Sequence, residues 1–167
     1  METVYLGMGS NLGDRKAFIQ HAISSLPPSV IPTLCSSLYQ TQPWGYEEQG
    51  EFLNMALEAQ TDLSPSELLL YLKDIEKRVG RKASFINGPR EIDIDILFFG
   101  NQIMEEDSLI VPHPRIQERP FVLGPLSEIA PNLSHPGLSK SLSKIMESLD
   151  MSSIRQLTDK GICAEIA

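Results

Sequence analysis

The sequence predicts an α+β fold, a ferredoxin-like sandwich in which a mainly antiparallel sheet is flanked by helices. The main observation is that β-rich segments and helix signals follow one another in the order strand, helix, strand, strand, helix, strand. A length of 167 residues, 41% of them hydrophobic and 22% charged, also fits one globular domain. We therefore expect residues 1–167 to form a single domain, with residues 151–167 as a C-terminal extension of unassigned role.

The first strand–helix–strand unit covers residues 3–41. Residues 3–8 are β-rich and nearly all apolar, as in a central strand covered on both faces. Asp14 is placed to cap a helix. The apolar side chains of that helix recur at helical spacing and are Phe18, Ile19, Ala22, Ile23 and Leu26. A second strand is expected at residues 34–41.

The second unit covers residues 52–99 and begins with a strand over residues 52–60. One strand face carries Leu53, Met55, Leu57 and Ala59, and the other carries Phe52, Asn54, Ala56 and Glu58. Residues 64–67 (SPSE) have the spacing of a capping box, and Gly80 is placed to end the helix that follows. Residues 92–99 form the last expected strand, and Gly100-Asn101 predicts a hairpin to residues 102–104. Short helices and loops are expected from residue 112 onward.

Charge is distributed unevenly along the chain. The formal net charge of −8 at pH 7 argues against nucleic-acid binding through a basic face. Between Lys77 and Arg90, however, stand five Lys or Arg residues and no acidic residue, so the rest of the chain carries −13. A small basic segment in an acidic protein predicts a compact anionic ligand.

The sequence also indicates where the protein works. It has no run of about 18 apolar residues, and Glu2 stands where a secretory signal would be basic. Cys35 and Cys163 are too few for a disulfide framework and lack metal-binding spacing. We expect a soluble cytoplasmic protein that binds neither membrane nor nucleic acid, and no obligate protein partner is evident.

A glycine-rich segment, residues 7–13 (GMGSNLG), lies between the first expected strand and helix. Its glycines are spaced GxGxxxG, whereas a dinucleotide-binding turn requires GxGxxG, and no acidic residue closes the second strand. The chain also lacks the GxxxxGK[ST] of a P-loop. We interpret the segment as a strand-to-helix turn.

Asp93 and Asp95 lie on one predicted strand. Alternation puts both carboxylates on the same face, with Cα atoms about 6.5–7 Å apart. Such a pair can hold Mg²⁺, which prefers one or two carboxylates together with substrate phosphate oxygens. The alternative is a solvated acidic strand face. The basic segment just upstream favours the first interpretation, because a metal-bound polyphosphate would reconcile the two signs of charge.

Arginines and one histidine are candidates for phosphate contacts. Arg90 follows a Gly-Pro turn that limits its movement, and an arginine fork suits phosphate oxygens. Arg81 and Lys82 could add further contacts from the same loop. His113 lies between two prolines and precedes Arg119, so that a rigid loop could present it to a nucleotide. A purely structural histidine is the alternative.

Phe52 and Phe121 are candidates for stacking on a flat ligand. Asn54 shares the predicted face of Phe52, and its amide has both donor and acceptor functions. The alternative is that both phenylalanines belong to the core. Trp44 could anchor a lid or form a surface patch, and its spacing does not decide between them.

Several segments, taken in order, carry a resemblance to a known family. They are residues 6–14 (LGMGSNLGD), 39–41 (YQT), 52–54 (FLN), 88–97 (GPREIDIDIL), 111–115 (VPHPR) and 119–121 (RPF). From about residue 3 to residue 132 the chain resembles the 6-hydroxymethyl-7,8-dihydropterin pyrophosphokinases of folate biosynthesis. The resemblance implies an ATP-dependent diphosphokinase that transfers pyrophosphate from MgATP to the pterin alcohol and releases AMP.

The resemblance also implies the roles of individual residues. Arg81, Arg90, Asp93 and Asp95 would be catalytic, and the two aspartates would bind two Mg²⁺ ions. The pterin would be bound by Thr41, Gln42, Pro43, Trp44, Phe52, Asn54 and Phe121. ATP would be bound by Glu76, Arg81, Arg90, Ile96, His113 and Arg119. Family members often carry Arg and Trp just before the GPR triplet, where this chain has Ile86 and Asn87.

The expected chemistry is an in-line attack by the hydroxymethyl oxygen on the β-phosphorus of ATP, achieved by positioning and charge neutralisation. No side chain is an obvious general base. Two alternatives remain: a non-catalytic ferredoxin-like module that binds a small molecule, and a Mg²⁺-dependent nucleotidyl transferase.

Overall fold

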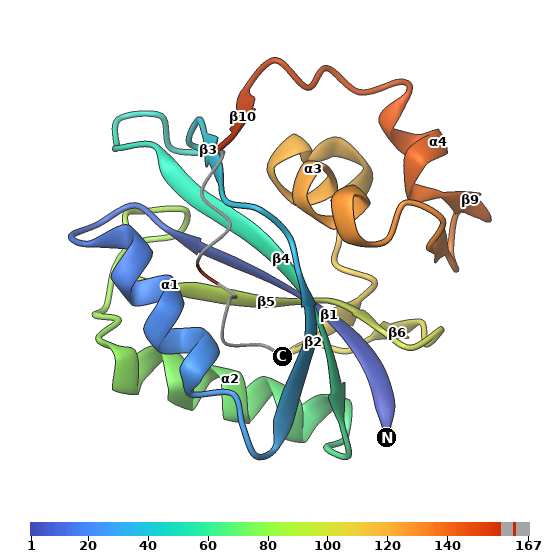
Figure 1. The fold of residues 1–167 in the computed structure, drawn as a ribbon, viewed down its shortest axis with the longest axis horizontal. Coiled ribbons are helices and arrows are strands. Elements are labelled where there is room, and N and C mark those ends of the chain that lie inside the picture. The colour runs from blue at the N-terminus through green and yellow to red at the C-terminus, as the bar shows by residue number, and fades with distance from the viewer. Residues whose placement is uncertain (158–161, 163–167) are drawn as a thin grey trace.

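The computed structural model describes residues 1–157 and Ile162 (Figure 1). Its elements in chain order are β1 (Glu2–Ser10), α1 (Arg15–Ser24), β2 (Val30–Cys35), β3 (Tyr39–Thr41), β4 (Phe52–Thr61), α2 (Pro65–Val79), β5 (Asp93–Phe99), β6 (Met104–Glu105), β7 (Ile110–Val111), η1 (Ile116–Glu118), α3 (Pro120–Ile129), β8 (Ser134–His135), β9 (Lys140–Ser141), α4 (Leu142–Met146) and β10 (Ile154–Gln156). Within the described residues, a six-stranded sheet has the order β10-β3-β4-β1-β5, and β2 also pairs with β4.

The sheet interleaves the two predicted strand–helix–strand units. β1 lies between β4 and β5 and is antiparallel to both, so that Leu6 pairs with Leu57 on one side and with Ile96 on the other. β2 is antiparallel to β4 on the side away from β1. The two strands joined by α1 are therefore separated by β4, which is the split arrangement of a ferredoxin-like sandwich. The predicted fold class is confirmed.

Helices cover both faces of the sheet. In Figure 1, α1 and α2 lie on one side of the strands, and α3 and α4 lie on the other. Side chains alternate along each strand, so each face has its own apolar core. Leu6 and Leu57 belong to the core beneath α1 and α2, whereas Phe98 belongs to the core beneath α3, with Leu123 and Leu126.

The local signals that predicted the helix ends are confirmed. The Asp14 carboxylate accepts a hydrogen bond from the Ala17 N–H at 3.1 Å. In the capping box, the Ser64 N–H donates to Glu67 at 2.8 Å, and the Glu67 N–H donates to the Ser64 hydroxyl at 3.3 Å. Gly80 ends α2 with φ 131°, a conformation that a side chain would disfavour.

The expected single strand over residues 34–41 is wrong, because the structure has two strands there. β2 ends at Cys35, which pairs with Leu57, and β3 begins at Tyr39, which pairs with Asn54. One more residue lies between these pairs on the first chain segment than on β4, so the register shifts. Ser36 holds the bulge, since its N–H and its Oγ both bond to the β4 backbone at 2.9 Å.

The expected hairpin after β5 is also wrong. The chain does turn after Phe99, whose carbonyl accepts from the Gln102 N–H at 3.0 Å. Residues 102–104 do not return along β5, and Met104 pairs with Val111 instead. The reason is burial: Val111 is buried in the core, whereas Ile103 is exposed, so β7 and not residues 102–104 brings an apolar side chain back to the sheet.

Part of the C-terminal segment completes the sheet. β10 pairs with β3 in antiparallel fashion, and Ile154 packs closely on α3 at Gly124, where a Cβ atom would overlap its side chain. Residues 154–156 therefore have a structural role that the sequence did not reveal. Of the two cysteines, Cys35 ends β2, and Cys163 lies outside the described residues.

Candidate functional site

A cavity of about 540 Å³ opens between the sheet, the first turn of α3 and the loop of residues 81–91. Most of the predicted site residues line it: Thr41, Gln42, Trp44, Phe52, Asn54, Arg81, Arg90, Asp93, Asp95, His113, Arg119 and Phe121. Pro43 and Glu76 do not line it. Ile96 lines a second cavity of about 260 Å³, which shares Asp95 and His113 with the first.

Two glycines of the glycine-rich segment form part of the cavity floor. Gly7 and Gly9 lie on β1 between β4 and β5 and line the cavity. A Cβ atom at Gly9 would overlap Oδ1 of Asn54 on the neighbouring strand. Gly9 therefore keeps space for the Asn54 amide, which donates to the Thr41 hydroxyl at 2.7 Å.

Asp93 is surrounded by arginines. Its carboxylate contacts Arg81 at 3.0 Å and Arg90 at 3.3 Å. Burial alone would raise the pKa of Asp93, but the two arginines hold that pKa below its usual value. Asp93 is therefore a carboxylate anion at neutral pH, and it forms ion pairs with two of the arginines that line the cavity.

Asp95 has the opposite environment, although it lies on the same face of β5. Its carboxylate lies near the ring of His113, with 3.9 Å between Oδ2 and Nε2. Burial and the negative charge of Asp93 raise the pKa of Asp95 to about 7. The two carboxylates stand close together, and Arg81 and Arg90 form their ion pairs with Asp93, so a cation bound between the carboxylates would relieve the repulsion that Asp95 experiences.

A third carboxylate, Glu76 of α2, lies behind this pair and is only 2% exposed. It accepts hydrogen bonds from the Ile94 N–H at 2.7 Å, from Arg81 at 3.0 Å and from Lys73 at 3.1 Å. Burial raises the pKa of Glu76, while Lys73 opposes that shift. Glu76 fixes the β5 backbone at Ile94, between the two aspartates, and holds Arg81 beside Asp93.

The two phenylalanines line the cavity from the beginnings of β4 and α3. The guanidinium of Arg90 lies 4.7 Å from the ring centroid of Phe52. The rings of Trp44 and Phe121 lie 5.9 Å apart, with an interplanar angle of 50°, and Arg119 lies 6.0 Å from Phe121. Both rings therefore border the cavity, which favours a ligand contact over the interpretation that they belong only to the core. Trp44 packs on the same ring from its loop.

His113 and Arg119 meet at the edge of the cavity. The ring Nδ1 of His113 lies 3.4 Å from a terminal nitrogen of Arg119. The backbone N–H of His113 donates to the Leu97 carbonyl at 2.9 Å. Burial and the charge of Arg119 lower the pKa of His113, so it is neutral at pH 7. The buried Nε of Arg119 has no hydrogen-bond acceptor in the described part of the chain, so this arginine has a donor available for an anion.

Sequence reasoning missed the residues that join the surrounding loops. Asn11 accepts from the Arg90 N–H at 2.9 Å and donates to Gln49 at 2.8 Å. Gln49 in turn donates to the Asn87 carbonyl at 2.8 Å. Asn11 belongs to the glycine-rich segment, which the sequence predicts only as a turn. Its place in that segment is the one sequence signal for its role, because its partners Gln49 and Arg90 are 38 and 79 residues away in the chain.

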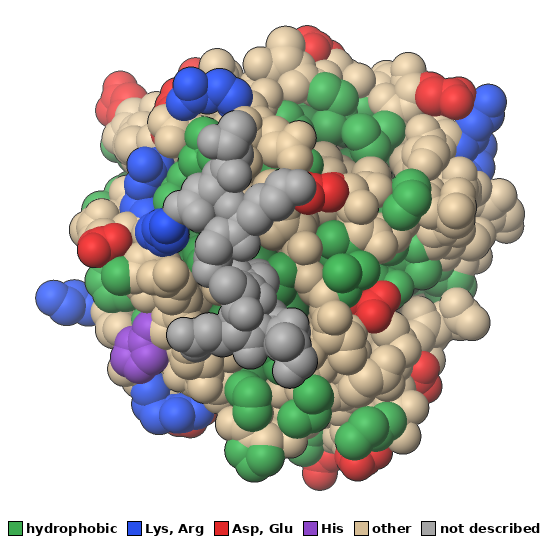
Figure 2. All heavy atoms as spheres, viewed as in Figure 1, with side chains coloured by type: hydrophobic (Ala, Val, Ile, Leu, Met, Phe, Trp, Pro, Cys, Tyr) green, Lys and Arg blue, Asp and Glu red, His purple; other side chains and the backbone are tan. Residues whose placement is uncertain are grey.

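Figure 2 shows one face of the molecule, on which Lys and Arg side chains gather mostly along the left edge. In Figure 1 the first turn of α1 and the loop of residues 81–91 lie at that edge. Within residues 1–157 and Ile162, no group of three or more His, Cys, Asp or Glu side chains is arranged to hold a metal ion. Any divalent cation in this cavity would therefore depend on the aspartate pair and on oxygens of a ligand.

An α+β sandwich whose cavity combines arginines, paired carboxylates and several aromatic rings defines a protein suited to binding a phosphorylated ligand beside a flat ring. Residues 5–131 match the family described as 7,8-dihydro-6-hydroxymethylpterin-pyrophosphokinase. The match covers more than half of the chain, and the chain belongs to this family.

Two bacterial relatives are each named 2-amino-4-hydroxy-6-hydroxymethyldihydropteridine pyrophosphokinase. The relative from Aquifex aeolicus is 49% identical over 144 residues, 86% of this chain and 90% of that protein. The relative from Bacillus subtilis is 48% identical over 127 residues, 75% of this chain and 76% of that protein.

Solved structures show the same fold at low sequence identity. The chain superimposes on Plasmodium falciparum HPPK-DHPS with pteroate with a TM-score of 0.72 at 15% identity, over 87% of this chain and 44% of that one. The chain spans less than half the length of that structure.

No helix within residues 1–157 combines the length and apolar character needed to span a membrane.

Proposed function

We propose that this chain transfers pyrophosphate from MgATP to 6-hydroxymethyl-7,8-dihydropterin, giving the pterin pyrophosphate and AMP, as a step of folate biosynthesis. Membership of the pyrophosphokinase family supports this reaction. The structural observation that carries it is one cavity in which two carboxylates and three arginines stand beside the rings of Phe52 and Phe121. The charged side chains suit the phosphates of ATP, and the phenylalanine rings suit the flat heterocycle of the pterin.

ATP would lie across the two adjoining cavities. Asp95 and His113 border both of them, and Ile96 lines the smaller one together with Leu109. An apolar lining of this kind suits a nucleobase, while the arginines of the larger cavity suit the phosphates. This arrangement supports the predicted ATP contacts of Ile96, His113 and Arg119. Glu76 would act indirectly, through Arg81.

The aspartate pair fits a magnesium site. Asp95 carries a raised pKa beside Asp93, and a cation between their carboxylates would relieve that repulsion. We propose that both residues hold Mg²⁺, with two ions shared between the carboxylates and the phosphates of ATP. Bound Mg²⁺ would neutralise phosphate charge and orient the reacting phosphates.

The pterin ring would lie between Phe52 and Phe121, with the amide of Asn54 and the hydroxyl of Thr41 at its edge. The hydrogen bond between Asn54 and Thr41 fixes which way both polar groups point. Gln42, Pro43 and Trp44 would complete this part of the site. Trp44 already packs on Phe121, so the bound ring would displace or reorient it.

The chain's own contribution to the transfer would be positioning and charge. The hydroxymethyl oxygen would attack the β-phosphorus in line, and Arg81 and Arg90 would stabilise negative charge on the transferring and leaving phosphates. Each arginine contacts Asp93 through one nitrogen, and its guanidinium has further N–H donors for phosphate oxygens. No described side chain is assigned as a general base.

Replacement of Asp95 tests the proposal. Asp95→Ala should lower kcat/KM on the order of 100-fold or more, because one of two carboxylates for the cation is lost. Asp74→Ala, which removes an exposed carboxylate on α2, is the matched control and should keep wild-type activity. Near-normal turnover by folded Asp95→Ala would contradict the assignment.

A calorimetric titration separates the enzyme from a non-catalytic binding module. A nonhydrolysable ATP analogue should bind tightly only with Mg²⁺, and the pterin should bind after it. Equal affinity for the analogue with and without Mg²⁺ would favour the binding module.

We further propose that the chain forms one pyrophosphokinase domain and that small molecules are its only obligate partners. We also propose that it works in the cytoplasm, where ATP is supplied. Cell fractionation should recover the chain in the cytoplasmic fraction, and its recovery in another compartment would contradict this location.

A further inference from the structure

Glu128, on the last turns of α3, ties this helix to β3 and to Ser37, which lies two residues before β3. Both oxygens of its carboxylate accept from the Ser37 N–H at 3.1 Å, one accepts from the Ser37 hydroxyl at 2.8 Å, and the other accepts from the Tyr39 hydroxyl at 2.8 Å. Ser37 and Tyr39 are buried, with exposures of 3% and 7%. Without Glu128 these buried donors would lose their acceptor, which is costly.

This contact lies at one end of the interface between α3 and β3, and the cavity lies at the other end. Along α3, Phe121 stands in the first turn, two turns before Glu128. Along β3, Thr41 lies two residues after Tyr39 and pairs with Phe52 of β4. Phe121, Thr41 and Phe52 all line the cavity, whereas Glu128 and Tyr39 do not. The angle between α3 and β3 therefore decides how far Phe121 stands from the strands.

Leu123 and Leu126 of α3 pack on the sheet in a buried apolar cluster, and the bonds of Glu128 add a directional contact at the end of α3 away from the cavity. Hydrogen bonds to a carboxylate are directional and stronger than neutral ones. Gln156 of β10 adds a bond to the Ser37 hydroxyl at 3.2 Å, so the same point is held from the C-terminal segment as well.

We propose that Glu128 is a positioning residue that acts through Tyr39 and Ser37: it sets the separation of α3 from β3 and thereby the width of the slot for the pterin ring. This inference rests on the proposed function, which puts that ring between Phe52 and Phe121. ATP would be bound mainly by β5, by the loop of residues 81–91 and by residues 113–119, so its affinity should not depend on Glu128.

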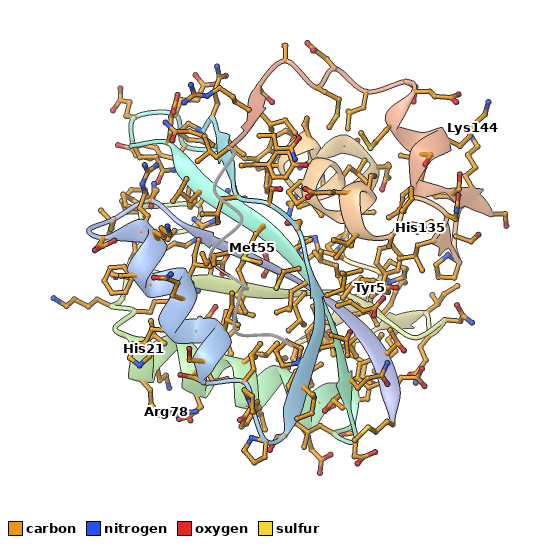
Figure 3. All side chains as sticks on the ribbon, in the orientation of Figure 1. Tyr5, His21, Met55, Arg78, His135 and Lys144 are labelled. Carbon is orange, nitrogen blue, oxygen red and sulfur yellow. The ribbon has the colours of Figure 1, made fainter. Side chains whose placement is uncertain are left out.

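The chain offers a matched control in Tyr5, which is labelled in Figure 3. Its hydroxyl donates to Glu58 at 2.9 Å, so Tyr5→Phe removes the same kind of bond as Tyr39→Phe. The bond of Tyr5 joins β1 to β4 within the sheet, and neither Tyr5 nor Glu58 lines the cavity.

The test measures, by calorimetry, the Kd of the pterin in the presence of Mg²⁺ and a nonhydrolysable ATP analogue, and the Kd of the analogue alone. Tyr39→Phe and Glu128→Gln should each raise the pterin Kd about three- to tenfold and leave the analogue Kd within about twofold. Tyr5→Phe should leave both constants unchanged. Glu128 is exposed on α3 and glutamine has its shape, so Glu128→Gln should fold even if Tyr39→Phe does not.

An unchanged pterin Kd in Glu128→Gln would overturn the inference, as would an equal rise in Tyr5→Phe, which would indicate general loosening. Turnover of the wild-type chain is measured separately. Wild-type protein that binds the pterin without converting it would contradict the proposed function and still leave the Kd ratios to decide the role of Glu128.

Discussion

Asp93 and Asp95 stand two residues apart on the same face of β5, yet their neighbours move their pKa values in opposite directions. Arg90 and Arg81 hold the pKa of Asp93 low against the effect of burial, whereas burial and Asp93 itself raise the pKa of Asp95. The sequence predicted the pair and the nearby arginines. It could not assign the arginines to one aspartate, because that depends on how the loop of residues 81–91 folds over β5.

Gly9 illustrates how one missing side chain shapes the site. Gly9→Ala should raise the KM for the pterin about tenfold, because the new Cβ would push the Asn54 amide away from Thr41. Gly50→Ala is the control, since a Cβ there would meet its nearest neighbour at an ordinary 3.6 Å. Steady-state kinetics with varied pterin measures the effect. Equal KM values for both variants would show that Asn54 does not contact the substrate.

Among the elements, those with local signals were predicted well. The caps of α1 and α2 and the alternation of β4 depend on residues close together in the chain, and all are confirmed. The bulge at Ser36, the pairing of β6 with β7 and the strand β10 depend on partners that are distant in sequence. No pattern within those short segments indicates their partners.

Strand β8 ends in His135, a buried titratable group that is outside the site. Nδ1 of His135 accepts from the N–H groups of Gly137 and Leu138 at 3.1 and 3.2 Å, and its ring packs edge-on against Phe98. Burial lowers the pKa of His135. The neutral imidazole is thus the form that the folded chain favours, whereas the unfolded chain takes up a proton near pH 6.5.

His135 should therefore make the fold sensitive to acid. Its stabilising contribution is present above about pH 6.5 and is lost as the pH falls, because the unfolded state then binds more protons. The free energy of unfolding, measured by urea denaturation at about pH 7.5 and pH 5, should fall less in His135→Gln than in the wild type. A pH dependence in His135→Gln equal to that of the wild type would contradict this role.

For the whole molecule, the sequence predicted the fold class and most of the residues that line the cavity. The specific blocks 88–97 and 111–121 contributed most, because they are short and carry their charged and aromatic residues at fixed spacing. The contacts that hold these blocks in place were not predictable: Asn11 joins the loops, and Glu128 joins α3 to β3 over 89 to 91 residues. Such contacts exist only once the sheet has formed.

The proposed reaction requires attack on the β-phosphorus of ATP and movement of a pyrophosphoryl group to the pterin. Phosphorus NMR of a reaction with MgATP and 6-hydroxymethyl-7,8-dihydropterin distinguishes it from the alternatives. A pyrophosphokinase should give equal amounts of AMP and of a pterin pyrophosphate, whose two phosphorus signals are coupled to each other. Release of inorganic pyrophosphate would indicate nucleotidyl transfer, and an unchanged ATP spectrum would indicate a binding module; either result would rule out pyrophosphoryl transfer by this chain.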